Sequence, residues 1–382
     1  MSSRIRIIGS LNVDMVTVTA RFPDPGETLT ATSFATSAGG KGANQAVACG
    51  RLSRPRPGSA SHAGIQHEAF HVEMVGAVGR LDTHFSTLMQ PTLEYSGVDI
   101  SRIRQVDDAH TGIAVIIVDS SAGGENRILL SPGANYAGMQ PTVDVLDLAT
   151  STPLPDLLVV QAEIPLETVI EVIRRVGQTK VQLQADGRRG VEGDIEVVFN
   201  PAPAPEGGLS EDVYAAIDHL IMNETECEIM APQELRNIGN VEERRTEIAK
   251  YFHRLGVRYV IVTLGAQGVW YSAADVGSSA QKDPQTWLRH VNHVPAAKVD
   301  RVVDTTGAGD TFVGGYAVQI ARWREQRRAS GKGTDDLTET ERCERYHTGI
   351  EAAIQWAVLA SARCVQQPGA MNSIPWGNEI EM

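Results

Sequence analysis

The amino-acid sequence predicts an α/β fold, in which helices cover both faces of a largely parallel sheet and a small lid of antiparallel strands lies beside it. Short apolar runs alternate with longer segments of helical periodicity, as in chains built from β-α units. Two further segments have strand composition around glycine turns, which is typical of hairpins. The 382 residues are 42% hydrophobic and 21% charged, enough apolar material for one large domain or two medium ones.

The apolar runs are the expected strands of the main sheet, in chain order residues 5–8, 72–78, 157–162, 219–222 and 258–264. Such short apolar runs are typical of strands that are buried on both faces. After the third run, the segment EIPLETVIEVIRRVG has apolar residues spaced near 3.6 positions apart. It predicts an amphipathic helix that ends at Gly177.

Two regions are expected to form the lid, at about residues 14–37 and 110–132, with turns at Pro25-Gly26 and Gly123-Gly124. The alternative is that they are peripheral edge strands. Three stretches rich in Gly, Ser, Pro or charge predict surface insertions, at about residues 51–70, 272–286 and 322–345. Within the last, the basic cluster 322–328 is interpreted as a solvated helix end.

Charge and cysteine usage exclude several classes of protein. The net charge is −13 and no basic stripe occurs, so no nucleic-acid partner is expected. The four cysteines form no C-x-x-C pair, which disfavours a zinc site or a disulfide framework and fits a reducing compartment. No apolar stretch of about 18 residues predicts a membrane span, and no signal peptide is recognised. A cytoplasmic location is therefore expected, and in a eukaryote also the nucleus.

The stretch VVDTTGAGDTFVGGYAVQI carries the strongest chemical signal. Gly307, Ala308 and Gly309 lie where a helical pattern starts, so their backbone N–H groups can approach an anion that the helix dipole favours. Asp310 falls in the first helical turn, placed to take a proton from a hydroxyl while the amides stabilise a phosphoryl group. The alternative is that Asp310 only complements the helix dipole.

Neither common nucleotide fingerprint is present. G-x-G-x-x-G would need glycine where Phe312 stands, and no lysine follows Gly309 as in a Walker loop. A second glycine loop, SAGGKGANQ, also fails the Walker pattern, because Lys41 is followed by Gly42 rather than Ser or Thr. A kinase built on these loops is therefore neither a P-loop enzyme nor a protein kinase.

Taken together, the motifs GSLNVD, PGET, GGKGANQAVA, NPAP, NETE, TLGAQG and DTTGAGDTF occur in an order that resembles the ribokinase (PfkB-type) family of carbohydrate kinases. The resemblance runs from about residue 5 to the C-terminal SIPW, outside the insertions. It implies a ribokinase-like three-layer α/β/α sandwich with a β lid, as a single catalytic domain over residues 1–382. The continuation KGANQA is similar to the ribose-phosphorylating members, since fructokinases and adenosine kinases usually differ at the lysine.

The resemblance implies that a pentose lies between the sheet and the lid. Its residues would be Asn12, Asp14, Gly40, Lys41, Gly42, Asn44, Glu163 and Asp310. A carboxylate can accept from two vicinal hydroxyls at once, which suits a sugar. Taken singly, an Asn or Asp after a strand is more often a turn residue than a ligand.

The family pattern also implies the phosphoryl-transfer machinery. Asp310 would deprotonate the O5 hydroxyl of ribose, and residues Gly307, Ala308 and Gly309 would form the anion hole for the γ-phosphate of ATP. The implied ATP-binding residues are Asn223, Thr263, Gly265, Gly268 and Gly309, and Asn223 and Glu226 would influence Mg²⁺ through water. Asn223 and Glu226 also fit a helix capping box, and both interpretations can hold.

The resemblance to ribokinases also implies activation by K⁺ bound beside the anion hole. The matching groups are Asp304, Thr306, Cys364, Gln367, Gly369 and Ser373, most of them acting through backbone carbonyls. One departure concerns nucleotide selectivity, because Val358 stands where a polar Asn or His near the adenine is usual. The lid predicts a homodimer, since an exposed sheet face needs cover.

Three functions stay open at this stage. The first is an ATP:D-ribose 5-phosphotransferase, favoured by Lys41, Asn44 and Asp14. The second is a related kinase for 2-deoxyribose, fructose or adenosine. The third is a catalytically silent sugar-binding protein on this fold, which the intact Asp310 disfavours.

Overall fold

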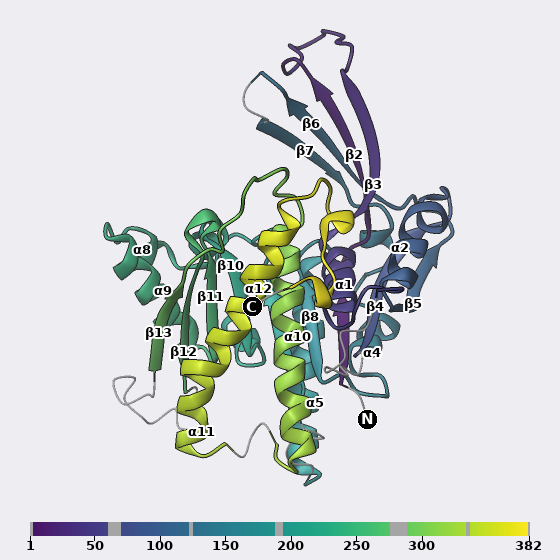
Figure 1. The fold of residues 1–382 in the computed structure, drawn as a ribbon. Helices are drawn as coiled ribbons and strands as arrows, with labels where there is room; N and C mark the ends of the chain where they lie inside the picture. Colours follow the sequence, from purple (N-terminus) through teal and green to yellow (C-terminus); the bar gives the residue numbers. More distant parts are fainter. Residues whose placement is uncertain are drawn as a thin grey trace.

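The computed structural model describes residues 3–59, 70–121, 125–187, 194–275, 289–333 and 337–380. Within these ranges, nine strands form a main sheet in the order β13-β12-β11-β10-β9-β8-β1-β4-β5 (Figure 1). All neighbours from β5 to β11 are parallel, whereas β12 and β13 are antiparallel. The strands are β1 (Arg4–Ile8), β4 (His71–Gly79), β5 (Val98–Val106), β8 (Leu157–Gln161), β9 (Glu196–Asn200), β10 (His219–Asn223), β11 (Tyr259–Thr263), β12 (Val269–Ala274) and β13 (Arg289–Val294).

Five of these strands, β1, β4, β8, β10 and β11, confirm the strands predicted from apolar runs. The sequence did not predict β5, β9, β12 and β13. The confirmed strands are buried along almost their whole length, as the burial of residues Ile5, Ile7 and Ile8 illustrates. β13 reads RHVNHV and β5 carries two arginines, because each lies at an edge of the sheet and meets solvent on part of its surface. Their polar composition hides them from a search for apolar runs.

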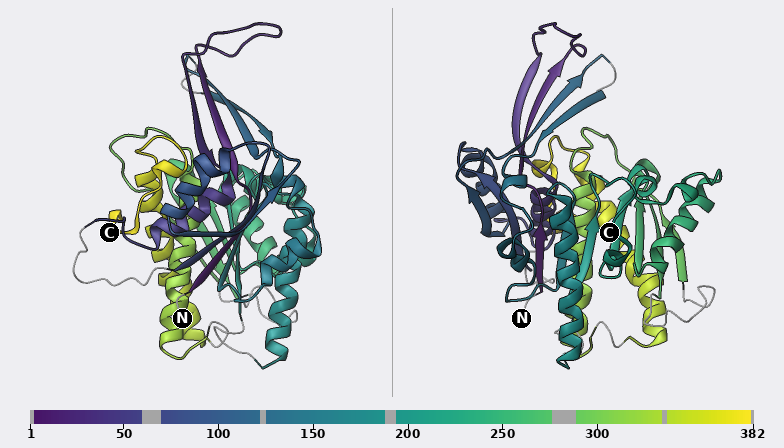
Figure 2. Two further views of the ribbon diagram at one scale, coloured as in Figure 1. Left: turned by 90° about the vertical axis from the view of Figure 1, so that its right-hand side faces the viewer. Right: turned by 180° about the vertical axis from the view of Figure 1, so that it is seen from behind.

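Helices cover both faces of the main sheet and complete the three layers (Figures 1 and 2). One apolar core lies under the first layer, which includes α1 (Lys41–Leu52), α2 (Gln90–Tyr95), α10 (Ala308–Ala329) and α12 (Ile350–Cys364). A second core lies on the opposite face, under a layer that includes α4 (Val143–Thr150), α5 (Leu166–Ala185), α7 (Glu224–Met230) and α9 (Val241–Arg254). The shorter helices are α3 (Ala134–Ala137), α6 (Glu211–Tyr214), α8 (Gln233–Arg236) and α11 (Glu339–Glu344). No helix in the described residues is long and apolar enough to cross a membrane.

The helix after β8 is longer than the sequence predicts. It was expected to end at Gly177, but α5 continues to Ala185. Gly177 is an internal residue of this helix, and a Cβ there would come within 3.0 Å of the Ala216 side chain. The glycine therefore permits close packing rather than marking a helix end.

The lid is a separate four-stranded sheet in the order β3-β2-β6-β7, standing above one end of the main sheet (Figure 1). Its strands are β2 (Asn12–Thr19), β3 (Ser33–Gly39), β6 (Gly112–Asp119) and β7 (Glu125–Ser131). β2 and β3 form one antiparallel hairpin and β6 and β7 another, while β2 and β6 pair in parallel where the hairpins meet. The predicted turn at Pro25-Gly26 is present, with Glu27 N–H donating to Asp24 O at 3.0 Å. The turn expected at Gly123-Gly124 lies outside the described residues.

The boundaries of the three predicted insertions need correction. α1 extends to Leu52, β12 extends to Ala274, and α10 runs to Ala329, so each segment begins inside an element. The third insertion also contains α11. Within it, the basic cluster 322–328 is not a solvated helix end, because the side chain of Arg324 is fully buried against the carboxylate of Glu196.

The strand order reverses between β8 and β1. The chain leaves β1 toward β4 and β5 on one side, and it leaves β8 toward β9 and β10 on the other. At such a point the connections diverge and leave room for ligands at the carboxyl ends of the strands. Ser10 follows β1 and Glu163 follows β8, and Ser10 Oγ donates to Glu163 Oε2 at 2.6 Å.

Candidate active site

The residues predicted to bind sugar and phosphate gather at the carboxyl ends of the parallel strands, on the side of the lid (Figure 1). Glu163 follows β8, Asn223 ends β10 and Thr263 ends β11. Asn12 and Asp14 begin β2, the strand that rises from this edge into the lid. The lid base and the main sheet therefore face one another across the predicted sugar site.

The glycines of the GGKGANQ loop allow the lid and α1 to approach closely. Gly40 has a φ of 90°, a conformation that favours glycine, and forms the N-cap of α1. A Cβ at Gly39 would lie 2.2 Å from Asp14 Oδ2, and one at Gly42 would lie 2.6 Å from the carbonyl carbon of Gly9. Larger residues would not fit at these glycine positions, and the loop can therefore bring Lys41 and Asn44 close to the edge of the sheet.

Glu163 joins several of the residues predicted to bind sugar through one of its two carboxylate oxygens. Oε2 accepts from Ser10 Oγ at 2.6 Å, from the backbone N–H of Lys41 at 3.1 Å and from Asn12 Nδ2 at 3.3 Å. Asn12 Oδ1 in turn accepts from Asn135 Nδ2 at 2.7 Å. Oε1 of Glu163 makes no hydrogen bond to a described residue and stays available to a ligand hydroxyl.

Asp310 is held by two amide side chains of α1. Asn44 Nδ2 donates to Asp310 Oδ2 at 2.8 Å, and Gln45 Nε2 donates to Oδ1 at 3.0 Å. Asp310 is 8% exposed and Asn44 is 5% exposed. Asn44 Oδ1 is buried and has no hydrogen-bond partner within the described part of the chain. A buried acceptor without a partner is costly unless a ligand or water satisfies it.

The site has an excess of carboxylates. Burial, followed by the negative charges of Glu163 and Asp310, raises the pKa of Asp14 to about 7, although Lys41 opposes this shift. The Asp14 carboxylate accepts no hydrogen bond from a described residue. Burial alone would lower the pKa of Lys41, but the surrounding carboxylates, with Asp310 the strongest and Glu226 among them, raise it overall. The positive charge of Lys41 therefore interacts both with the carboxylates predicted to bind sugar and with Glu226 of the NETE element.

The start of α10 has the geometry expected of an anion site. Gly307 is the N-cap with a φ of 77°, and a Cβ at Gly309 would meet no atom within 4 Å, so the backbone there is open to a ligand. The first N–H groups of a helix have no partner within the helix and attract anions. The N–H of Ala308 differs from this expectation, because it donates to Thr305 O at 3.2 Å.

The NETE element forms a complete capping box at the start of α7. Asn223 Oδ1 accepts from the Glu226 N–H at 2.8 Å, and Glu226 Oε2 accepts from the Asn223 N–H at 2.8 Å. Burial raises the pKa of Glu226, whose charge also interacts with Lys41 and Asp310. The element is therefore a helix cap that faces the same site. On the next strand, Thr263 leads into the turn of Gly265 and Gly268, both with positive φ.

The predicted K⁺ residues are also brought together. Asp304 Oδ1 accepts from the N–H of Thr306 at 2.9 Å, and Oδ2 accepts from the N–H of Gly369 at 2.8 Å, which joins the segment before α10 to the one after α12. These hydrogen bonds lower the pKa of Asp304 against the opposing effect of burial. Ser373 Oγ contacts Cys364 Sγ at 3.0 Å. Gln367 and Ser373 line a pocket of about 510 Å³.

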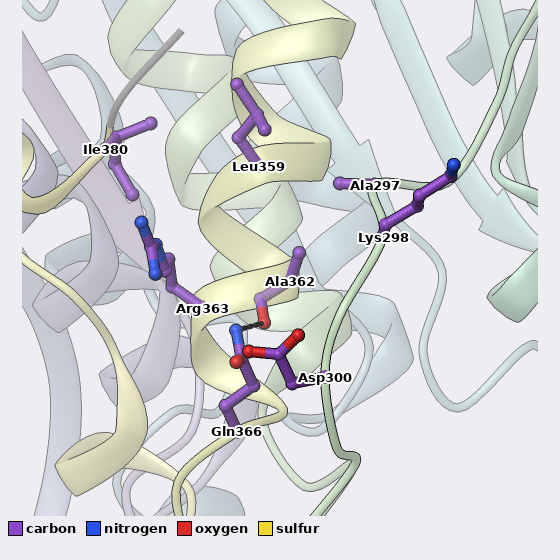
Figure 3. A pocket seen from close by; sticks show the side chains of 8 residues that line it. All are labelled: Ala297, Lys298, Asp300, Leu359, Ala362, Arg363, Gln366 and Ile380. Atoms are coloured by element: carbon purple, nitrogen blue, oxygen red, sulfur yellow. Dashed lines mark hydrogen bonds between the residues drawn. The ribbon is translucent and has the colours of Figure 1, made fainter.

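A second pocket, of about 170 Å³, lies against α12 and contains none of the predicted site residues (Figure 3). It is bordered by Lys298 and Asp300 on the loop before α10 and by Arg363 and Gln366 at the end of α12. Gln366, just after α12, donates from Nε2 to Ala362 O in the last turn of the helix at 2.8 Å. Among the described residues that line it, Asp300 is the one carboxylate, and the N-terminus of α10 does not border it.

Sequence reasoning missed the residues that support Asp310 without facing a ligand. Gln45 hydrogen bonds to Asp310 and to Asn200, and it accepts from Gln161. Both glutamines are completely buried. Gln45 directly follows Asn44 in the GGKGANQ motif, which marks the segment in the sequence but not the distant partners of this side chain. Val358, on α12, is 9% exposed and packs in the apolar core.

Comparison with known proteins identifies the class to which this fold and site belong. A family model described as pfkB family carbohydrate kinase matches residues 2–377. The chain therefore belongs to the pfkB family of carbohydrate kinases. The ribokinase of Schizosaccharomyces pombe is 34% identical over 382 residues, which cover 99% of this chain and 96% of the relative. The deoxyribokinase of Salmonella typhi is 30% identical and covers 97% of this chain and 95% of its own.

Solved structures agree with this assignment. The ribokinase of Giardia lamblia has a TM-score of 0.74 and 27% identity, covering 100% of this chain and 98% of its own. A structure of Arabidopsis thaliana ribokinase complexed with ribose and ATP has a TM-score of 0.71 and 26% identity, with the same coverage. The expected sandwich with its β lid is confirmed, and the chain is a sugar kinase of the ribokinase type.

Proposed function

We propose that this protein is an ATP:D-ribose 5-phosphotransferase, which converts D-ribose and ATP to D-ribose 5-phosphate and ADP. One observation carries the proposal. The Asp310 carboxylate stands in the first turn of α10, beside an open helix N-terminus and beside buried acceptors without partners. A base, an anion site and hydroxyl acceptors are the three requirements for phosphorylating a polyhydroxyl compound.

The sugar is bound by groups that the protein leaves partly unsatisfied. The Asp14 carboxylate, Glu163 Oε1 and Asn44 Oδ1 can all accept hydrogen bonds from hydroxyl groups, and Lys41 can donate to a hydroxyl oxygen. A ligand rich in hydroxyls would therefore relieve the desolvation of several buried acceptors at once. Gly40 and Gly42 let the backbone lie close to the ring. This arrangement favours a compact sugar with several hydroxyls.

In the transfer step, the O5 hydroxyl attacks the γ-phosphorus of ATP in line while its proton moves to Asp310. The bond from the γ-phosphorus to the β,γ-bridging oxygen breaks, and ADP leaves with that oxygen. The backbone of Gly307 and Gly309 stabilises negative charge on the transferred group, and Ala308 joins them if its N–H leaves Thr305 O. Asn223, Thr263, Gly265 and Gly268 hold the nucleotide along the ends of β10 and β11.

Two cations fit the residues present. Glu226 and Asn223 offer oxygen donors beside the phosphate site, where Mg²⁺ with its own waters would neutralise phosphate charge. Thr306, Cys364, Gln367 and Gly369 would offer backbone carbonyls and Asp304 a carboxylate, with Ser373 beside Cys364. A K⁺ ion held there would fix the two segments that Asp304 already joins.

Location and assembly are part of the same proposal. The protein would act in the cytoplasm, and in a eukaryote also in the nucleus, without nucleic-acid or membrane partners. The lid exposes large apolar side chains, with Phe34 63% and Leu129 66% exposed, which supports a homodimer formed through the lid. Sedimentation tests this assembly, and a fully active monomer at micromolar concentration would contradict it.

A panel of sugars with coupled ADP detection tests the substrate. Ribose is expected to have the highest kcat/KM, ahead of 2-deoxyribose, fructose and adenosine. The similarity to a deoxyribokinase makes 2-deoxyribose the alternative to exclude. Equal or better turnover of 2-deoxyribose, fructose or adenosine would contradict ribose as the substrate, and no turnover of any sugar would contradict a kinase.

A further inference from the structure

The Asp310 carboxylate lies at the end of a buried hydrogen-bonded chain of amide side chains, which extends to the ends of two strands of the main sheet. Gln45 Nε2 donates to Asp310 Oδ1 at 3.0 Å and to Asn200 Oδ1 at 3.1 Å. Gln45 Oε1 accepts from Gln161 Nε2 at 2.6 Å. Gln45 and Gln161 are completely buried, and Asn200 is 8% exposed. The chain links α10 to α1 and to the carboxyl ends of β8 and β9.

The direction of every hydrogen bond in this chain is determined by a backbone carbonyl. Asn200 Nδ2 donates to Ile221 O at 2.9 Å, and a carbonyl can only accept. Asn200 therefore turns Oδ1 toward Gln45, which must present its NH₂ group there and to Asp310. The Gln45 carbonyl then faces Gln161, whose amide donates to it. The backbone of β10 therefore fixes the orientation of Gln45, so that its NH₂ group, and not its carbonyl oxygen, faces Asp310.

We propose that Gln45, oriented by Asn200 and Gln161, is a positioning residue for phosphoryl transfer, which holds the Asp310 carboxylate toward the acceptor hydroxyl. The inference rests on the proposed function, because it assigns Asp310 as the base. Gln45 holds Oδ1 while Asn44 holds Oδ2, so the carboxylate has no freedom to rotate. Gln45 touches no ligand on this account and acts only through Asp310.

A purely structural role for Gln45 predicts different results. Loss of a buried hydrogen bond would then lower stability and leave the reaction of the folded enzyme unchanged. A positioning role predicts a lower kcat, an unchanged KM for sugar and an altered pH profile. The groups that face Asp310 in such a profile are Asp14 from β2, Lys41 from α1, Glu226 from α7 and Cys364 from α12.

The test compares Gln45→Met with Gln178→Met, the same exchange at an exposed position of α5. Gln45→Met should lower kcat about tenfold to a hundredfold, the size of effect that misplacement of a reacting group produces. The acidic limb of its kcat profile should move to higher pH, because a donor to the carboxylate is lost. Gln45→Glu places a second carboxylate beside Asp310. It should move the acidic limb of the kcat profile to still higher pH than Gln45→Met does. Gln178→Met should match the wild type.

An unchanged kcat and pH profile in folded Gln45→Met would overturn the inference, whatever the change in melting temperature. If that variant does not fold, Gln161→Leu serves instead, since it removes the donor to Gln45 Oε1 and with it one of the hydrogen bonds that hold the Gln45 side chain in place. It should lower kcat and move the limb in the same direction by less, and wild-type behaviour would overturn the inference. A wild type that phosphorylates no sugar contradicts the proposed function itself, whereas an active wild type with unaffected variants contradicts only the positioning role.

Discussion

The two ends of α10 bury charge in opposite ways. At its start, Asp310 lies with Asp14, Glu163 and Glu226 around Lys41, and the buried acceptor Asn44 Oδ1 has no partner among the residues that the structure describes. Near its other end, the carboxylate of Glu196 accepts from Arg324 at 2.9 Å, from Arg345 at 2.9 Å and from His219 at 2.7 Å. The first end has excess negative charge, whereas at the second the carboxylate is paired with arginines, and Arg324 also pairs with Asp194 at 3.5 Å.

The start of α10 is the open end, because it leaves an acceptor for a ligand. The region around Glu196 is the closed end, because the protein itself satisfies that carboxylate. Burial favours a raised pKa for Glu196, but Arg345, His219 and Arg324 outweigh it and lower the pKa well below its usual value. The Arg345 guanidinium lies 3.7 Å from the Trp323 ring centroid, and His219 contacts Tyr316 Oη at 2.8 Å. The carboxylate is satisfied by the protein itself. A buried charge cluster therefore points to function where its acceptors are left open, and to scaffolding where they are not.

The largest expected effect follows from removing the base at the open end. Asp310→Asn should lower kcat by about 10²- to 10⁴-fold, the contribution typical of general base catalysis. Sugar binding should be largely retained, because the other acceptors are intact. Coupled ADP release and calorimetric titration with ribose measure the two quantities. A near-wild-type kcat would remove Asp310 from the mechanism.

At the closed end, Glu196→Gln should act on stability instead. Two buried arginines would lose the charge of Glu196, and Arg345 would keep no ion pair with a carboxylate within the described residues. Breaking such a buried pair costs about 3–5 kcal/mol in the free energy of unfolding. The folded enzyme should keep its kcat, since Asp310 is untouched. Denaturant unfolding measures the loss, with Glu94→Gln on exposed α2 as the matched control. Equal stability of the two variants would contradict the scaffolding role.

The pH dependence of Asp14 distinguishes a functional carboxylate from a structural one. Its pKa is about 7 in the folded state, so between the unfolded value and about 7 the folded state holds the extra proton. This contribution therefore makes the ligand-free protein less stable as pH rises through that window. Ribose affinity should change in the opposite sense and weaken below about pH 7, where the protonated carboxyl accepts hydroxyl hydrogen bonds poorly.

Asp14→Asn checks both effects. It should remove the pH-dependent component from the stability and from ribose binding, and it should make the protein more stable than the wild type at pH 8. Thermal unfolding and ribose titration at pH 5.5 and pH 8 provide the measurements. Identical pH dependence in variant and wild type would show that another group titrates.

The smallest effect is expected at the predicted K⁺ site around Asp304, which can influence Asp310 only through the loop before α10. K⁺ should stimulate turnover more than Na⁺ at equal ionic strength. Asp304→Asn should reduce that stimulation, because it weakens the connection between Thr306 and Gly369. Initial rates across a K⁺ titration test this, and equal stimulation by Na⁺ would contradict a selective K⁺ site.

The sequence predicted the open end better than the closed one. Glycine loops and the residues at strand ends are local signals, so the two loops and the family motifs led to Asp310, Asn44 and Glu163. The cluster around Glu196 joins residues more than a hundred positions apart, and Arg324 looks like a surface charge in its own segment. Gln45 was missed for a related reason, since only the folded chain shows that its partners are Asp310, Asn200 and Gln161.

Phosphorus NMR of the products tests the central claim most directly. With ATP and D-ribose, the wild type should convert the γ-phosphate signal to that of a phosphomonoester coupled to the two protons on C5. Asp310→Asn should leave the ATP signals unchanged over the same time. A monoester coupled to the single proton on C1, or ATP consumed without a sugar phosphate, would contradict transfer to O5 by the Asp310 edge.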